Sequence, residues 1–314
     1  MIDPEIKEKT KSSLIEACEQ LAPKIGNTPL VTLSELSPSV NVQMFAKLEW
    51  RQPGWSVKTR AAYFIVRDAL KSGRLDRHKQ ILDASSGNTG IAYAWIGREL
   101  GIGVTLCIPE NASEERKRIL YKLGATLHFT SRTGTTDEAQ ETAQELYQHH
   151  PDRYFFADQY NNDNNWKAHF NTTGKEIIEQ TGRRVTHFVA GLGTTGTFTG
   201  TGRRLRSEIP DIRLIALQPD QPMHGLEGWK HLETACIPGI YDSTLVDEMR
   251  IVSTERAYEL IKNIATEKRL GISPSSAANL AGAMELADTL DEGVIVTIFP
   301  DDGSKYSEVN GRFK

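Results

Sequence analysis

One lysine of the sequence stands where a positive charge is electrostatically unfavourable. Lys58 follows Pro53-Gly54-Trp55 and opens a segment with helical periodicity, so its charge would lie at the positive end of a helix dipole. A lysine in such a place can form a Schiff base, in which its charge is shared with a cofactor. A lone Ser-Val-Lys motif is weak, and a lysine that points into solvent is the simpler interpretation of this motif by itself.

Two further motifs combine glycine with small polar residues directly after a predicted strand. Residues 83–90 read Asp-Ala-Ser-Ser-Gly-Asn-Thr-Gly, and residues 191–197 read Gly-Leu-Gly-Thr-Thr-Gly-Thr. Hydroxyl groups and the free N–H groups of a helix N-terminus form anion sites. The first motif therefore suits a carboxylate and the second a phosphate, although the first could equally be an ordinary helix cap.

The glycine pattern of residues 191–197 leaves another interpretation open. It satisfies the GxGxxG fingerprint of dinucleotide binding, and Asp220 follows the next predicted strand, so a nicotinamide-dependent oxidoreductase is an alternative. The loop contains no lysine, which excludes a Walker A site. A fourth motif, Ser-Pro-Ser-Ser at residues 273–276, is by itself typical of a helix start.

Short apolar segments alternate with segments of helical periodicity along the chain. This alternation predicts an α/β protein with mostly parallel sheets, in which ligands bind at the carboxyl ends of the strands. The predicted strands are residues 42–48, 80–84, 104–108, 186–190, 213–217 and 294–299. Residues 158–165 are rich in Asn and Asp, which predicts a loop near a domain boundary.

Composition narrows the function further. The 314 residues suggest two domains or one large α/β unit, and a net charge of −4 predicts no general attraction to nucleic acid or membrane. Three cysteines in no CxxC pair and eight histidines in no HExxH or HxH pattern argue against disulfides and a metal site. The N-terminus lacks a signal peptide, and no apolar segment approaches the ~20 residues of a membrane span. A cytoplasmic protein is expected.

In their order and spacing, the motifs resemble the cysteine synthase (O-acetylserine sulfhydrylase) family of fold-type II pyridoxal-phosphate enzymes, including its B-type branch. The resemblance begins at Gly-Asn-Thr-Pro-Leu, residues 26–30, and ends at Phe-Pro-Asp-Asp-Gly-Ser-Lys-Tyr, residues 299–306, so it covers nearly the whole chain. Between these ends lie Lys-Leu-Glu at residues 47–49, Ile-Pro-Glu-Asn at residues 108–111 and the four motifs above.

The resemblance implies two α/β domains, each with a mostly parallel sheet flanked by helices, as in the tryptophan synthase β-like fold. It implies a smaller mobile domain of residues 46–156 that carries a substrate-carboxylate loop. The larger domain would comprise residues 12–45 and 157–314 and carry the loop that binds the phosphate of the cofactor. A homodimer is expected on the same basis.

The resemblance also assigns roles to single residues. Lys58 would hold pyridoxal 5'-phosphate as a Schiff base and later move the Cα proton, and Asn88 would bind the ring hydroxyl. The substrate carboxylate would be bound by Ser85, Ser86, Thr89 and Gln159. The phosphate would be bound by Gly193, Thr194, Thr195, Gly196 and Thr197. Ser275 would contact the pyridine nitrogen, with Ser273 and Ser276 as alternatives.

The implied reaction is β-replacement on an activated serine by a sulfur nucleophile, giving L-cysteine. O-phosphoserine sulfhydrylases, cystathionine-forming enzymes, serine or threonine β-eliminating enzymes and catalytically silent cofactor-binding relatives remain alternatives. The chain departs from the family pattern at Trp55 and Thr59, beside Lys58. It also has Asp220 where phosphoserine-using relatives carry Arg. Because an acid there would repel a phosphorylated leaving group, O-acetylserine is favoured.

Overall fold

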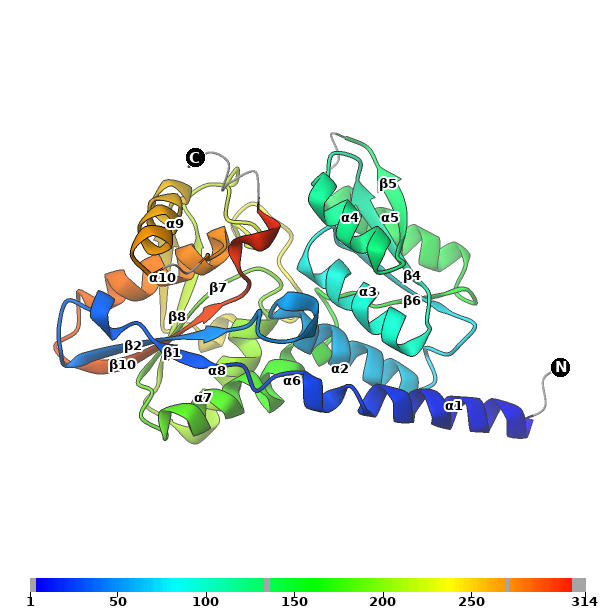
Figure 1. Cartoon of the computed structure of the whole chain (residues 1–314), viewed down its shortest axis with the longest axis horizontal. Helices are drawn as coiled ribbons and strands as arrows, with labels where there is room; N and C mark the ends of the chain where they lie inside the picture. Colours follow the sequence, from blue (N-terminus) through cyan, green and yellow to red (C-terminus); the bar gives the residue numbers. More distant parts are fainter. Residues whose placement is uncertain (1–3, 133–135, 269–270, 307–314) are drawn as a thin grey trace. The chain divides into compact units, whose positions relative to one another are not determined.

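The computed structural model describes residues 4–132, 136–268 and 271–306. The chain divides into two compact units, each built from two separate stretches of sequence. Unit 1 comprises Met1–Ile25 and Lys58–Asn164, and unit 2 comprises Gly26–Val57 and Asn165–Lys314. Each unit has its own sheet and helices (Figure 1). The expected fold class, two α/β domains with mostly parallel sheets, is confirmed.

This division differs from the expected domain limits at residues 157–164, which belong to unit 1, and in two further places. Helix α1 (Pro4–Glu19) belongs to unit 1, because its residues Leu14 and Cys18 are buried in the core of that unit. Residues 46–57 belong to unit 2, where strand β2 (Val42–Leu48) pairs in parallel with β10 (Gly293–Phe299). Both differences come from packing between segments far apart in the sequence, which local patterns do not report. Of the expected domains, residues 133–135, 269–270 and 307–314 lie outside the described residues.

Unit 1 is built on a four-stranded parallel sheet in the order β5-β4-β3-β6. Its strands are β3 (Gln80–Ala84), β4 (Val104–Pro109), β5 (Thr126–Thr130) and β6 (Tyr154–Phe156). Its further helices are α2 (Lys58–Lys71), α3 (Asn88–Leu100), α4 (Glu114–Lys122) and α5 (Thr136–His149). Ile81 packs with the core of α2 and α3, whereas Leu82 packs with α5. Successive residues face opposite sides, so both faces are covered and the central strands are apolar.

Unit 2 contains a six-stranded sheet in the order β1-β2-β10-β7-β8-β9, in which only the β1–β2 pair is antiparallel. The remaining strands are β1 (Leu30–Thr32), β7 (His187–Gly191), β8 (Arg213–Pro219) and β9 (Glu248–Val252). The helices are α6 (Asn164–Asn171), α7 (Thr173–Thr181), α8 (Gly196–Glu208), α9 (Thr254–Lys268) and α10 (Pro274–Ala287). Helices α7 and α8 pack on one face of the sheet, and α9 and α10 pack on the other.

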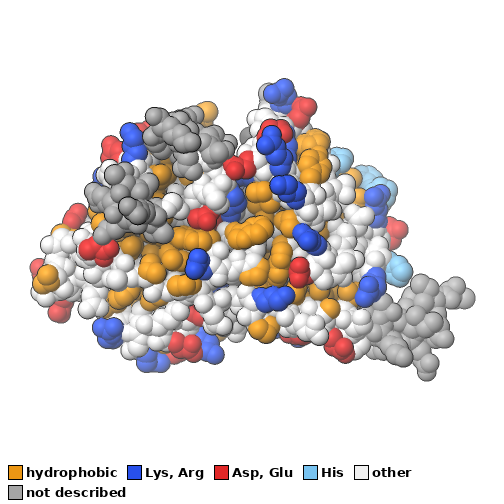
Figure 2. Space-filling view, viewed as in Figure 1, with side chains coloured by type: hydrophobic (Ala, Val, Ile, Leu, Met, Phe, Trp, Pro, Cys, Tyr) orange, Lys and Arg blue, Asp and Glu red, His pale blue; other side chains and the backbone are white. Residues whose placement is uncertain are grey.

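Short 3-10 helices occur in the connections. They are Ala22–Lys24, Ser34–Leu36, Pro53–Trp55, Ser243–Leu245 and Gly303–Lys305. None of the helices in the described ranges is long and apolar enough to cross a bilayer. The face drawn in Figure 2 intersperses acidic and basic side chains over both units.

Candidate active site

The 85–89 loop of unit 1 connects β3 to the first turn of α3. Ser85 Oγ accepts hydrogen bonds from the backbone N–H groups of Gly87, at 3.3 Å, and Gly90, at 3.2 Å. The N-cap residue of α3 is Gly87, which has no side chain to cap the helix. The loop therefore wraps around the Ser85 hydroxyl and presents the amino end of a 13-residue helix, the arrangement that attracts an anion.

Gln159 joins this loop from a distant part of unit 1. The Thr89 hydroxyl donates to Gln159 Oε1 at 2.7 Å, and both side chains are buried. Because this bond occupies the amide oxygen, Nε2 is the Gln159 atom that can donate to an anion. The structure thus brings together Thr89 and Gln159, and it places Ser85 and Ser86, both half-buried, in the same loop.

Lys58 is the first residue of α2 and is half-buried. The backbone that leads to it is held by Gln52, whose side chain is buried. Gln52 Oε1 accepts from the N–H of Gly26 at 3.0 Å, while Nε2 donates to the carboxylate of Glu49 at 2.9 Å and to Ser56 O at 3.2 Å. Gln52 was not among the predicted site residues, because its partners become neighbours only in the folded chain.

The 193–197 loop of unit 2 connects β7 to α8 and is tightly packed. A Cβ on Gly193 would lie 1.9 Å from Gly228 O, so only glycine fits there. Asn165 Nδ2 donates to Thr194 Oγ1 at 3.1 Å. Thr195, the N-cap of α8, has a φ of 66°, and its buried Oγ1 has no hydrogen-bond partner among the described residues. Both the strained backbone and the unsatisfied hydroxyl are features of binding sites.

Ser275 lies in the first turn of α10 and is buried. Its Oγ is 3.1 Å from Ser273 Oγ and 3.5 Å from Asp301 Oδ1. Ser273 Oγ donates to Ser276 Oγ at 3.0 Å, and Ser276 Oγ donates to Asp301 O at 2.7 Å. The hydroxyl groups of Ser273, Ser275 and Ser276 therefore all donate within the protein.

The terminal motif holds this helix start in place. The Tyr306 hydroxyl donates to Asp301 Oδ2 at 2.7 Å, and Lys305 forms an ion pair with the same carboxylate at 3.4 Å. Lys305 Nζ also donates to Trp55 O at 2.9 Å. The motif thus ties α10 to the segment that precedes Lys58.

Asp83 is a buried acid with a strongly raised pKa directly before the 85–89 loop. Burial at the end of β3 raises the pKa of its carboxyl from 3.8 to about 7 against the lowering effect of the Ala84 N–H, and the nearby charge of Asp158 raises it further. Burial, followed by the charge of Asp83, raises the pKa of Tyr93 well above its usual value. Sequence reasoning did not select Asp83, although an acid within an apolar strand was the available signal.

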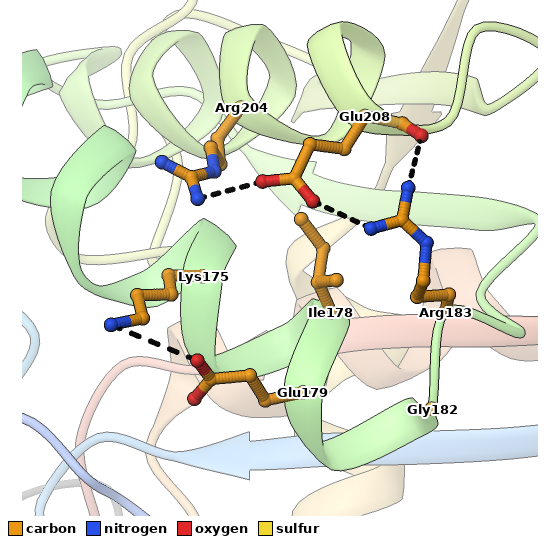
Figure 3. A pocket seen from close by; sticks show the side chains of 7 residues that line it. All are labelled: Lys175, Ile178, Glu179, Gly182, Arg183, Arg204 and Glu208. Atoms are coloured by element: carbon orange, nitrogen blue, oxygen red, sulfur yellow. Dashed lines mark hydrogen bonds and ion pairs between the residues drawn. The ribbon is translucent and has the colours of Figure 1, made fainter.

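A cavity of about 420 Å³ lies beside α7 and α8 (Figure 3). Its charged groups are paired: Glu208 binds Arg183 at 2.8 Å and Arg204 at 2.6 Å, while Lys175 lies 3.7 Å from Glu179. None of the predicted site residues lines this cavity. We therefore do not assign it to the active site.

The family model for pyridoxal-phosphate dependent enzymes matches residues 21–301 of the chain. The chain belongs to this family. This pyridoxal-phosphate dependent enzyme is 47% identical over 298 residues to the cysteine synthase of Aquifex aeolicus, covering 93% of this chain and 91% of the relative. It is 34% identical over 288 residues to an O-acetylserine dependent cystathionine beta-synthase of Bacillus subtilis, covering 90% of this chain and 94% of the relative.

Solved structures show the same relationship. The crystal structure of a cysteine synthase from Entamoeba histolytica superposes with a TM-score of 0.86 at 31% identity, covering 91% of this chain and 88% of that chain. The predicted family and the predicted cofactor, pyridoxal phosphate, are confirmed. The GxGxxG pattern at residues 191–197 therefore belongs to a pyridoxal-phosphate enzyme rather than to a nicotinamide-dependent oxidoreductase.

The residues present fit this cofactor. The buried, unsatisfied hydroxyl of Thr195 stands at the amino end of the 13-residue helix α8, where a phosphate group is stabilised. Gly193 lies so close to Gly228 O that no side chain fits there. The loop backbone at this position is therefore not covered by a side chain of its own. Lys58 supplies a half-buried amine at the start of α2.

Proposed function

We propose that the protein catalyses β-replacement on an activated serine, with O-acetylserine favoured, in which a sulfur nucleophile adds to the β-carbon to give L-cysteine. The observation that carries this proposal is the 47% identity to a cysteine synthase over 93% of the chain. When bound, pyridoxal phosphate supplies an electron-withdrawing ring that makes the Cα proton of an amino acid acidic.

Lys58 has two roles in this proposal. Its Nζ holds the cofactor covalently, and after release it takes the proton from Cα of the substrate. The Gln52 contacts with Gly26 and Ser56 fix the approach of the chain to Lys58.

The remaining predicted residues orient the two ligands. Asn88, at the start of α3, binds the ring hydroxyl, and Ser275, in the first turn of α10, binds the ring nitrogen. The substrate carboxylate is bound by Ser85, Ser86, Thr89 and Gln159. The cofactor phosphate is bound by Gly193, Thr194, Thr195, Gly196 and Thr197.

Asp220 supports an uncharged leaving group. It directly follows β8, is exposed, and is fixed through its backbone N–H, which donates to Val252 O at 3.2 Å. A carboxylate at this position disfavours a phosphorylated substrate. We therefore prefer O-acetylserine over O-phosphoserine.

Cystathionine formation is the second candidate. The Bacillus subtilis relative, named an O-acetylserine dependent cystathionine beta-synthase, matches 90% of this chain. That reaction would differ from cysteine synthesis in the thiol that adds to the β-carbon. Turnover with sulfide compared with turnover with homocysteine separates the two.

We further propose that unit 1 moves when substrate binds, which would exclude water from the reaction. A cytoplasmic location and a homodimer complete the proposal. All three cysteines are free thiols, which supports a reducing compartment. Light scattering of the purified holoenzyme measures the oligomeric state.

Replacing Lys58 tests the site assignment. Lys58→Ala should remove the absorption band of the covalently held cofactor and lower turnover by at least about a thousandfold, because both the attachment and the proton transfer are lost. Lys71→Ala is the matched control, since Lys71 lies at the other end of α2 and pairs at the surface with Glu19. Normal turnover of Lys58→Ala would contradict the assignment.

A further inference from the structure

Asp83 connects the end of β3 to the segment that carries Gln159. It is 1% exposed and lies two residues before Ser85, the first residue of the 85–89 loop. Its Oδ1 accepts from the N–H of Ala84 at 2.8 Å, and its carboxyl also accepts from the N–H of Gln159. One buried carboxyl group therefore contacts the backbone at the end of β3, directly before the 85–89 loop, and the backbone of the segment that carries Gln159.

The groups around Asp83 do not supply a positive charge to balance it. They belong to α3, to β4 and to the segment after β6, and are Tyr93, Cys107, Asp158 and Tyr160. On α5, which packs against β3, the charge of Asp137 acts on Tyr160. All these groups are neutral or negative, so an ionised Asp83 has no cation among them.

We propose that Asp83 is a positioning residue that takes up a proton when a substrate carboxylate binds at the 85–89 loop. This inference rests on the proposed function, because it requires a carboxylate ligand at that loop. Two negative charges in a low-dielectric region disfavour each other, and a proton on one of them removes the repulsion. Protonated Asp83 can still accept from Ala84 and gains a donor at Oδ2, a buried oxygen that has no hydrogen-bond partner among the described residues.

Carboxylate binding and protonation of Asp83 are thermodynamically coupled, and this coupling sets the direction in which affinity changes with pH. If binding of a carboxylate favours protonation of Asp83, protonation equally favours binding of the carboxylate. Because burial raises the pKa of Asp83 to about 7, the carboxyl changes its charge in the neutral range. Carboxylate affinity should therefore be higher below about pH 7 and lower above it.

The test uses the holoenzyme and propionate, a carboxylate without an amine. Its dissociation constant is measured from the cofactor absorption band between about pH 6 and about pH 8.5, and proton uptake is measured by calorimetry in two buffers of different ionisation enthalpy. Affinity should fall by roughly tenfold across this range, which corresponds to a coupling of about one pKa unit. Asp83→Asn should show a flat profile and no proton uptake.

Two neighbouring variants separate this role from a structural one. The nearby Tyr93 hydroxyl lowers the pKa of Asp83 and the Asp158 charge raises it. Tyr93→Phe should therefore move the inflection to higher pH, and Asp158→Asn should move it to lower pH. Loss of a purely structural contact would not move the inflection in opposite directions.

The outcomes are decisive even if Asp83→Asn fails to fold. Unchanged inflections in both neighbouring variants, or a pH dependence retained in Asp83→Asn, would overturn the proposal. Propionate binding does not require turnover. If propionate affinity depends on pH as expected but no cysteine is formed, the proposed reaction is contradicted, whereas the role of Asp83 is supported.

Discussion

The two loops that we propose as anion sites have the same local design but different surroundings. The 85–89 loop and the 193–197 loop each follow a parallel strand and lead into a 13-residue helix whose N-cap side chain makes no capping bond. Residues 85–88 are half-buried, whereas residues 193–196 are buried. A Cβ on Gly87 would meet nothing within 4 Å, whereas one on Gly193 would meet Gly228 O at 1.9 Å.

This difference matches the two ligands that we assign. The 193–197 loop is shaped by its own protein contacts and suits a phosphate group that stays bound through many turnovers. The 85–89 loop is more open and lies next to a carboxyl group that titrates near neutral pH. It suits a carboxylate that binds and leaves in each cycle.

The largest expected effect concerns Asp83, beside the 85–89 loop, and is a change in protein stability with pH. Burial raises the pKa of Asp83 from 3.8 to about 7, so its contribution to stability is fully present below about pH 4 and is lost as the pH rises through about 7. The loss amounts to roughly 4 kcal/mol, and Asp83→Asn should remove it. Urea unfolding at several pH values measures the effect. If the free energy of unfolding changes equally with pH in wild type and Asp83→Asn, the prediction is contradicted.

The next contrast comes from packing in the 193–197 loop. Gly193→Ala would place a Cβ against Gly228 O, which should destabilise the protein by roughly 1–3 kcal/mol and loosen cofactor binding. Urea unfolding of the apoenzyme and cofactor release on dialysis report the two effects separately. A variant with wild-type stability and retention would show that the loop is not rigid.

A smaller effect with two opposite signs is expected at Thr195. Its φ of 66° is unfavourable for a β-branched residue, so Thr195→Gly should stabilise the apoenzyme by about 1 kcal/mol. The same change removes the buried hydroxyl and should weaken cofactor retention by roughly tenfold. If apoenzyme stability and cofactor retention both rise or both fall in Thr195→Gly, the prediction of opposite effects is wrong.

The smallest effect is expected at Gly87, the counterpart of Gly193 in the open loop. Its φ of −103° suits other residues and there is space for a Cβ. Gly87→Ala should therefore change stability by less than about 0.5 kcal/mol. Any effect should appear in the KM of the amino-acid substrate, measured in steady state, rather than in cofactor retention. Loss of the cofactor from this variant would reverse the assignment of the two loops.

Much of the fold could be predicted because buried parallel strands are apolar and precede glycine-rich turns. The strand at β3 was predicted to the residue, and β7 within one residue. Helical periodicity alone does not separate α6 from α7, whose boundary is a break in the backbone at Thr172. Strand β1 has only three residues, and β9 contains the charged residues Glu248 and Arg250, so neither has the continuous apolar segment of a buried strand.

The candidate site could be predicted only in part, because some of its residues are recognised by local sequence and others only by their tertiary contacts. Glycine, serine and threonine clusters at strand ends are visible in the sequence, so both loops could be named. Gln52 and Asp83 act through partners that are distant in sequence or buried, such as Gly26 and Tyr93. Such contacts depend on tertiary packing, which sequence patterns do not show.

The most direct test of the account is a visible absorption spectrum of the holoenzyme, recorded before and after O-acetylserine and again after sulfide. The proposed reaction predicts a cofactor band that shifts with O-acetylserine, returns when sulfide is added, and yields one cysteine for each O-acetylserine consumed. A band that does not respond to O-acetylserine, with no cysteine formed, would contradict the proposed function.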